Sequence, residues 1–175
     1  MWDLRLVKIF IEYVDGASEW SGKAVAWLML PLIFELTYDS IARYVFNAPT
    51  IWSYDVSYML YAAIFMIGGA YTLLDEKHIR IELFYDMFSL KGRAIIDIIG
   101  YVVFFFPVIG AIFYFGIEYV TDSWRLLEHC EASYWSPPIY HFKTLIPISA
   151  FLLLLQGAGK FIRAIGIITE REHIN

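Results

Sequence analysis

Residues 56–74 read VSYMLYAAIFMIGGAYTLL, and this stretch decides the fold because it contains no charged side chain. An α-helix rises about 1.5 Å per residue, so about 20 apolar residues cross the hydrocarbon core of a bilayer. Ser53 is a suitable helix N-cap, and Asp55 lies where the positive end of the helix dipole favours an acid. We therefore predict a transmembrane helix over residues 53–74.

Three further segments have the same apolar character. They contain the runs AVAWLMLPLIF, AIIDIIGYVVFFFPVIGAIFYFGI and LIPISAFLLLLQGAG. We expect spans over about 23–46, 94–117 and 144–168, the first of them kinked at Pro31. Only 18% of the 175 residues are charged, against about 25% in soluble domains. The prediction is an all-α integral membrane protein with four transmembrane helices and a single membrane domain over residues 1–175.

Residues 2–20 are predicted to form an amphipathic helix ahead of the first span. At 100° per residue, one face carries Arg5, Lys8, Glu12 and Asp15, and another carries Trp2, Leu6, Ile9, Phe10 and Tyr13. This pattern is typical of a helix that lies in the membrane surface. A helix that docks against a partner is the alternative.

Lysine and arginine alternate between the segments that connect the spans. They occur before the first span, in residues 75–93 and after the last span, whereas the 47–52 turn has none and the 118–143 segment has few. Since basic residues favour the cytoplasmic side, both termini are expected in the cytoplasm.

Three charged residues, Glu35, Asp39 and Arg43, share one face of the first span because they are four positions apart. Asp39 precedes Arg43 at the favourable spacing for an ion pair, which we expect to form. A polar seam against another helix or subunit is the main interpretation, and an ion path is the alternative. Gly68 and Gly69, with Gly157 and Gly159, are expected where helices approach closely.

Several function classes are excluded by the residues that are missing. The sequence has no catalytic motif, none of its four histidines lies in an apolar span, and Cys130 is the only cysteine. We expect no enzyme activity, cofactor or metal site. The formal net charge of -5 argues against nucleic acid as a partner. The 118–143 segment is either a solvated loop or a docking edge for an extracytoplasmic partner, with Glu118, Asp122, Trp124 and Glu128.

Residues 43–86 carry a series of motifs in a fixed order. An arginine ends the first span, Asn-x-Pro follows, Trp-Ser-acid opens the second span, and a Gly-Ala pair precedes a His-Ile-Arg-Ile-acid loop. The positions are Arg43, Asn47, Pro49, Trp52, Ser53, Asp55, Gly69, Ala70, His78, Ile79, Arg80, Ile81 and Glu82. Together they resemble the small membrane subunit of the tripartite ATP-independent periplasmic (TRAP) transporters, which more often have Glu at the position of Asp55.

The later part of the chain resembles the branch of that family labelled for mannitol or chloroaromatic compounds. The positions that carry this likeness are Ser123, Trp124, Glu128, Ser133, Lys143, Ile146, Pro147, Leu155, Gln156 and Gly157. The branch's Gly-rich run before the proline is absent, and Tyr134-Trp135-Ser136 stand there instead. The likeness covers most of the chain from the first span onward.

The resemblance implies an accessory subunit of the bacterial inner membrane. Such a subunit braces a large carrier subunit and helps to dock a periplasmic substrate-binding protein, in sodium-driven uptake of an organic acid. Trp52, Asp55, His78 and Gln156 would then be structural or interface residues beside the seam on the first span. Membrane lipids are further partners. The alternative from another class is a membrane anchor for a redox enzyme complex.

Overall fold

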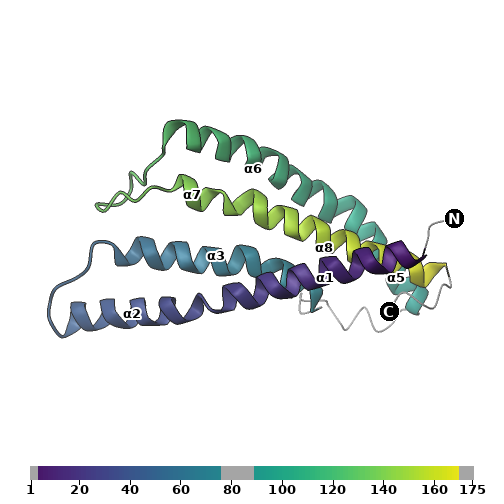
Figure 1. The fold of residues 1–175 in the computed structure, drawn as a ribbon, viewed down its shortest axis with the longest axis horizontal. Coiled ribbons are helices and arrows are strands. Elements are labelled where there is room, and N and C mark those ends of the chain that lie inside the picture. The colour runs from purple at the N-terminus through teal and green to yellow at the C-terminus, as the bar shows by residue number, and fades with distance from the viewer. Residues whose placement is uncertain (1–3, 76–88, 170–175) are drawn as a thin grey trace.

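The computed structural model describes residues 4–75 and 89–169, and these form a bundle of long helices (Figure 1). The first half contains α1 (Leu4–Ala26), α2 (Met29–Tyr44) and α3 (Ser53–Leu74). The second half contains α5 (Leu90–Gly100), the π-helix η1 (Tyr101–Phe105), α6 (Phe106–Leu126), the short α7 (Tyr140–Lys143) and α8 (Leu145–Ile168).

Within residues 4–75 and 89–169, four helical stretches are long and apolar enough to cross a membrane, which confirms the predicted four-span, all-α fold. They cover Arg5–Tyr44, Ser53–Leu74, Lys91–Leu126 and Tyr140–Ile168. The start of α1 and the end of α8 lie at the same end of the molecule in Figure 1, as four crossings require. Which end faces the cytoplasm stays a prediction.

The first stretch has its helix break at Trp27–Leu28, whereas the sequence placed a boundary between residues 20 and 23. Pro31 explains the break, because proline lacks the N–H that would bond to the Trp27 carbonyl and its ring crowds that group. The helix α1 is a packed element with a buried face towards α3 and α8, formed by Ile11, Val14, Ser18, Ser21 and Val25. Its position relative to the membrane surface stays a prediction.

The third stretch is longer than the predicted span 94–117 at both ends. It continues as α6 to Leu126, because Gly116, Val120 and Ser123 repeat at helical spacing on a buried face. Leu127, with φ of 47°, then ends the helix in the left-handed conformation. The non-helical connection is therefore shorter than the predicted 118–143 segment.

The same stretch widens into a π-helix at Tyr101–Phe105, which ends two residues before Pro107. Because Pro107 cannot donate a hydrogen bond to the preceding turn, the wider turn accommodates its ring. The ring of Phe105 lies against Gly157 of α8, where a Cβ atom would overlap it. The glycine thus allows α8 to receive the aromatic side chain.

The centre of the bundle contains mainly small and polar residues. Alanines 63, 70, 94, 150 and 164 are buried together with Ser18, Ser123, Ser149 and Gln156. Large apolar side chains instead lie exposed along the outer faces of α2, α3 and α6. This distribution is typical of membrane helices, which meet through small residues and turn large apolar ones towards lipid or a partner subunit.

Candidate functional site

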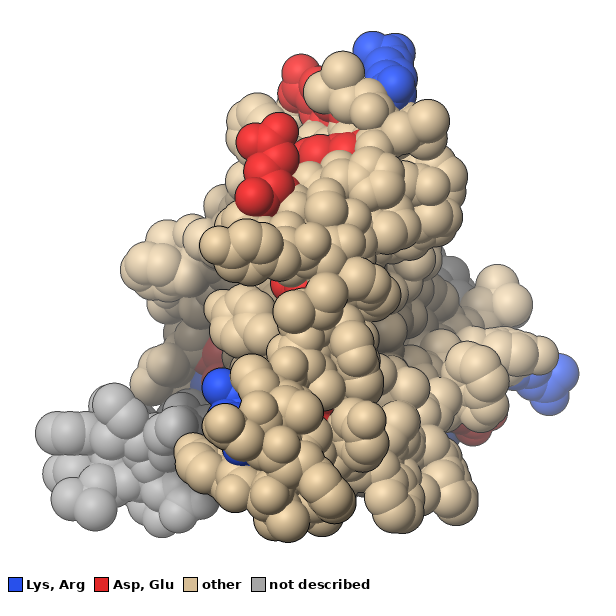
Figure 2. All heavy atoms as spheres, turned by 90° about the vertical axis from the view of Figure 1, so that its left-hand side faces the viewer, with Lys and Arg blue, Asp and Glu red and all other residues tan. Residues whose placement is uncertain are grey.

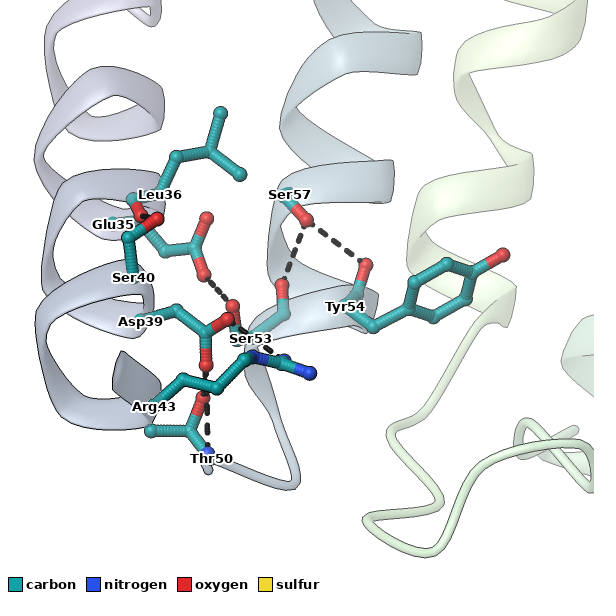
Figure 3. A network of polar contacts seen from close by, with 9 residues as sticks. All are labelled: Glu35, Leu36, Asp39, Ser40, Arg43, Thr50, Ser53, Tyr54 and Ser57. Atoms are coloured by element: carbon teal, nitrogen blue, oxygen red, sulfur yellow. Dashed lines mark hydrogen bonds and ion pairs between the residues drawn. The ribbon is translucent and has the colours of Figure 1, made fainter. Parts of the chain in front are cut away.

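The corner between α2 and α3 contains the polar seam that the sequence predicted. Glu35 is buried, and it accepts a hydrogen bond from the hydroxyl of Ser53 at the start of α3 (Figure 3). Its second carboxylate oxygen, Oε2, is also buried and has no hydrogen-bond partner among the described residues. The seam therefore faces α3 inside this chain.

Asp39 is the central residue of this corner. Arg43 Nη2 donates to Asp39 Oδ2 at 2.9 Å, which confirms the expected ion pair. Thr50 donates to Asp39 Oδ1 through its hydroxyl at 2.5 Å and through its backbone N–H at 3.4 Å. Asp39 thus holds the turn after α2 as well as the arginine. The ring of Trp52 stacks on Tyr38 at 6.1 Å between centroids.

Asp55 connects α3 to the distant segment between α6 and α7. The side chain is buried and accepts a hydrogen bond from the Ser133 hydroxyl. The sequence suggested both residues through the family motifs but not their contact. Because they are 78 positions apart, only the packing of the two halves brings them together.

Glu128 forms a second polar cluster where α6 meets α8. Its Oε2 atom accepts hydrogen bonds from Lys143 Nζ at 2.5 Å and from the Ser123 hydroxyl at 2.7 Å. Lys143 is buried, and its ammonium lies 4.1 Å from the centroid of the Tyr119 ring, a cation–π distance. The hydrogen bond from Lys143, followed by that from Ser123, lowers the pKa of the Glu128 carboxyl below its ordinary value of 4.5.

The Glu128 cluster predicts a pH-dependent stability. Since the pKa is lower in the folded chain, the carboxylate stabilises the fold above about pH 4.5, and this is lost as the pH falls through the folded-state value. Glu128→Gln should therefore lower the melting temperature at about pH 7, and the difference from wild type should shrink at about pH 3.5. Thermal unfolding of the wild type and the variant in detergent, at each pH, measures this difference in melting temperature. A difference that stays constant over this range would contradict the assignment.

The remaining candidates of this region, which are Glu118, Asp122 and Trp124, lie on α6. Trp124 donates from Nε1 to the Thr144 hydroxyl at 3.0 Å and packs edge-on against Tyr140, so it joins α6 to α7. Glu118 and Asp122 are exposed, and Asp122 lies 3.5 Å from Arg125. Figure 2 faces this end of the molecule and shows acidic side chains gathered over the end of α6.

Gln156 lies in a polar contact between α1 and α8. It is fully buried, accepts a hydrogen bond from Ser18 at 2.7 Å and donates one to Asp15 at 3.1 Å. Asp15 also pairs with Arg163. These residues tie α1 to α8, which makes Gln156 a structural residue of the chain's own core. Asp15, Ser18 and Arg163 were not among the sequence candidates, because nothing in their spacing indicates the contact.

The candidate glycines differ in their surroundings. Gly157 receives the Phe105 ring, Gly69 has only an ordinary contact with Leu153 at 3.8 Å, and Gly68 has nothing within 4 Å of an added Cβ. Gly22, which the sequence analysis missed, lies against Tyr71 of α3, and an added Cβ would come within 2.5 Å of Cβ and Cγ of that tyrosine. His78, with the loop motif that it begins, lies outside the described residues.

Each of these polar clusters joins two separate elements of the chain. The described residues contain no group of three or more His, Cys, Asp or Glu side chains that could hold a metal ion.

Comparisons with known proteins assign these features to a family. The family described as "Tripartite ATP-independent periplasmic transporters, DctQ component" matches residues 32–166, which is more than half of the chain. The matched region contains the α2–α3 corner, the Glu128 cluster and Gln156. A comparison with curated proteins found no match.

Proposed function

We propose that this chain, which belongs to the DctQ family of tripartite ATP-independent periplasmic transporters, braces the large membrane subunit of such a transporter and helps to dock its substrate-binding protein. The family is a transporter component, so the chain is not an enzyme. Its match gives no support to the alternative of a redox-enzyme anchor. The observation that carries the proposal is the match itself, which extends over 32–166 and includes α3, α6 and most of α2 and α8.

The finer parts of the proposal rest on the resemblance of the sequence motifs. We propose sodium-driven uptake of an organic acid, and a place near the mannitol and chloroaromatic branch. The chain would lie in the bacterial inner membrane with both termini in the cytoplasm, as the distribution of lysine and arginine supports. Surrounding lipids would cover those apolar faces that the large subunit leaves open.

The bracing role is supported by the contrast between core and surface. The polar side chains of the α2–α3 corner and of the Gln156 contact bond to other helices and turns of the same chain, which stiffens the bundle, and among their buried polar atoms only Oε2 of Glu35 has no hydrogen-bond partner within the described residues. In contrast, bulky side chains such as Phe34, Phe65 and Phe104 are each at least 68% exposed. Such surfaces suit packing against another membrane protein or lipid, and they provide no polar path across the membrane.

Co-expression with the large subunit tests the proposed function. We expect both subunits to co-purify from detergent in a one-to-one complex. Liposomes with both subunits and the binding protein should accumulate substrate when sodium is high outside, whereas liposomes with this chain alone should not. Sodium-dependent uptake by this chain alone would contradict the accessory role, and so would full uptake by the large subunit and binding protein without it.

A further inference from the structure

The segment between α6 and α7, residues 127–139, is a hydrogen-bonded hairpin. Ile139 N–H donates to the Glu128 carbonyl at 3.0 Å, and Cys130 N–H donates to the Pro137 carbonyl at 2.9 Å. His129 Nδ1 lies 2.9 Å from the Ser136 carbonyl oxygen. These contacts bridge the two arms, so the hairpin has a defined shape although it is neither helix nor extended sheet.

Side-chain contacts hold this hairpin to the rest of the bundle on two sides. Ser133 near its tip bonds to the buried Asp55 of α3, and Glu128 at its base bonds to Lys143 before α8. The Trp124–Thr144 hydrogen bond joins the helices that enter and leave it. A loop held at base and tip loses little conformational freedom when a partner binds, which favours affinity.

The tip of the hairpin presents two aromatic side chains. Tyr134 is 100% exposed and Trp135 is 45% exposed, directly after the anchored Ser133. In Figure 1 the hairpin extends past the ends of α6 and α7 towards the start of α3, so its tip lies beyond the helical part of this half. Rigid, exposed Tyr and Trp side chains are the residue types that most often dominate binding energy at protein interfaces.

The hairpin and the last turns of α6 that lead into it carry exposed acidic side chains. Glu131 on the hairpin and Glu118 and Asp122 on α6 are exposed, with Arg125 as the nearby exposed base. Lys143 is buried against Glu128 and contributes little positive surface. Charge complementarity therefore favours a partner whose contact surface is basic around an apolar pocket.

We propose that Tyr134 and Trp135 are the anchor by which a soluble extracytoplasmic protein, the substrate-binding protein of the same transporter, docks on this chain. The inference rests on the proposed function and gives it a site. The aromatic pair enters a pocket on the partner, while Glu118, Asp122 and Glu131 steer basic groups at its rim. Trp124 and Glu128, which the sequence also offered as docking residues, hold the base of the hairpin through Thr144 and Lys143.

Binding to the intact complex tests the anchor. The two membrane subunits are placed in nanodiscs, and the purified binding protein is titrated against them. The double variant Tyr134→Ser/Trp135→Ser should weaken binding by about tenfold or more, mainly through faster dissociation. Asp122→Asn should mainly lower the association rate and its salt dependence. Tyr44→Ser is the matched control, because Tyr44 is 84% exposed at the same end but lies on α2.

Cysteine labelling at the tip of the hairpin distinguishes contact with the binding protein from contact with lipid. In a Cys130→Ser background, Tyr134→Cys is labelled with a membrane-impermeant maleimide in the nanodisc complex. Strong labelling that the binding protein suppresses supports the anchor. Labelling that the bound protein leaves unchanged overturns it, and a position that resists labelling in both states indicates lipid contact and also overturns it.

The test distinguishes failure of the anchor from failure of the proposed function. If wild-type complex binds the protein and the double variant binds equally well at an unchanged melting temperature, only the anchor is wrong. If the wild-type complex neither forms nor binds the protein, both the anchor and the proposed function are wrong. The single variant Tyr134→Ser should leave the melting temperature unchanged, since Tyr134 is 100% exposed, and it should still weaken binding.

Discussion

Gly22→Ala is expected to destabilise the chain strongly, because α1 and α3 meet at this residue. A Cβ atom on Gly22 would lie 2.5 Å from both Cβ and Cγ of Tyr71. Tyr71 Cβ is fixed to the backbone of α3 and cannot swing away, so the two helices must separate. Overpacking of this kind costs about 1–3 kcal/mol, against a gain of at most about 1 kcal/mol from replacing a helical glycine. Gly22→Leu should destabilise the chain more than Gly22→Ala, because its side chain is larger.

Gly16→Ala is the matched control for this experiment. It lies on the same helix, and nothing is within 4 Å of the position that its Cβ would occupy. This variant should be as stable as wild type or slightly more stable, by up to about 1 kcal/mol. Thermal unfolding of the purified protein in detergent compares the two. Equal stability of both alanine variants would show that α1 does not approach α3 as closely as described.

Asp39→Ala is expected to lower the melting temperature more than Arg43→Ala. The aspartate holds Arg43, the Thr50 hydroxyl and the Thr50 N–H, whereas its arginine partner is half exposed and donates to Asp39. Loss of Asp39 thus frees the turn that starts α3 and leaves a charged partner without its counter-ion near the membrane boundary. Yield of the complex with the large subunit should fall in the same order.

A double-mutant cycle tests whether the two residues act together. The double variant Asp39→Ala/Arg43→Ala should lose less than the sum of the two single losses, because no orphan charge remains. Glu19→Gln is the control: Glu19 pairs with Lys23 at the same spacing, but both side chains are more than half exposed, so it should have little effect. Strictly additive losses of stability from the two single substitutions would contradict the proposed coupling of Asp39 and Arg43.

The features that sequence reasoning found are local along the chain. The sequence predicts a helix over residues 53–74, and the chain forms one there, since segment length and the absence of charge over 56–74 are properties of a single segment. The Asp39–Arg43 pair follows from a spacing of four residues, which places the two side chains on adjacent turns. The motifs around Trp52 and Asp55 indicate the same family as the match over residues 32–166.

What the sequence determined by itself is therefore the number of spans, the helical class and the neighbours one turn apart. Only the tertiary structure decided that Glu35 meets Ser53, that Asp55 meets Ser133 and that Gln156 meets Ser18 and Asp15. It also placed Gly22 against Tyr71 and extended α6 to Leu126. The physical reason is that these contacts depend on the rotation and register of helices packed together. Both are set by side chains far apart in the chain, and any face of an apolar helix could otherwise have turned inward.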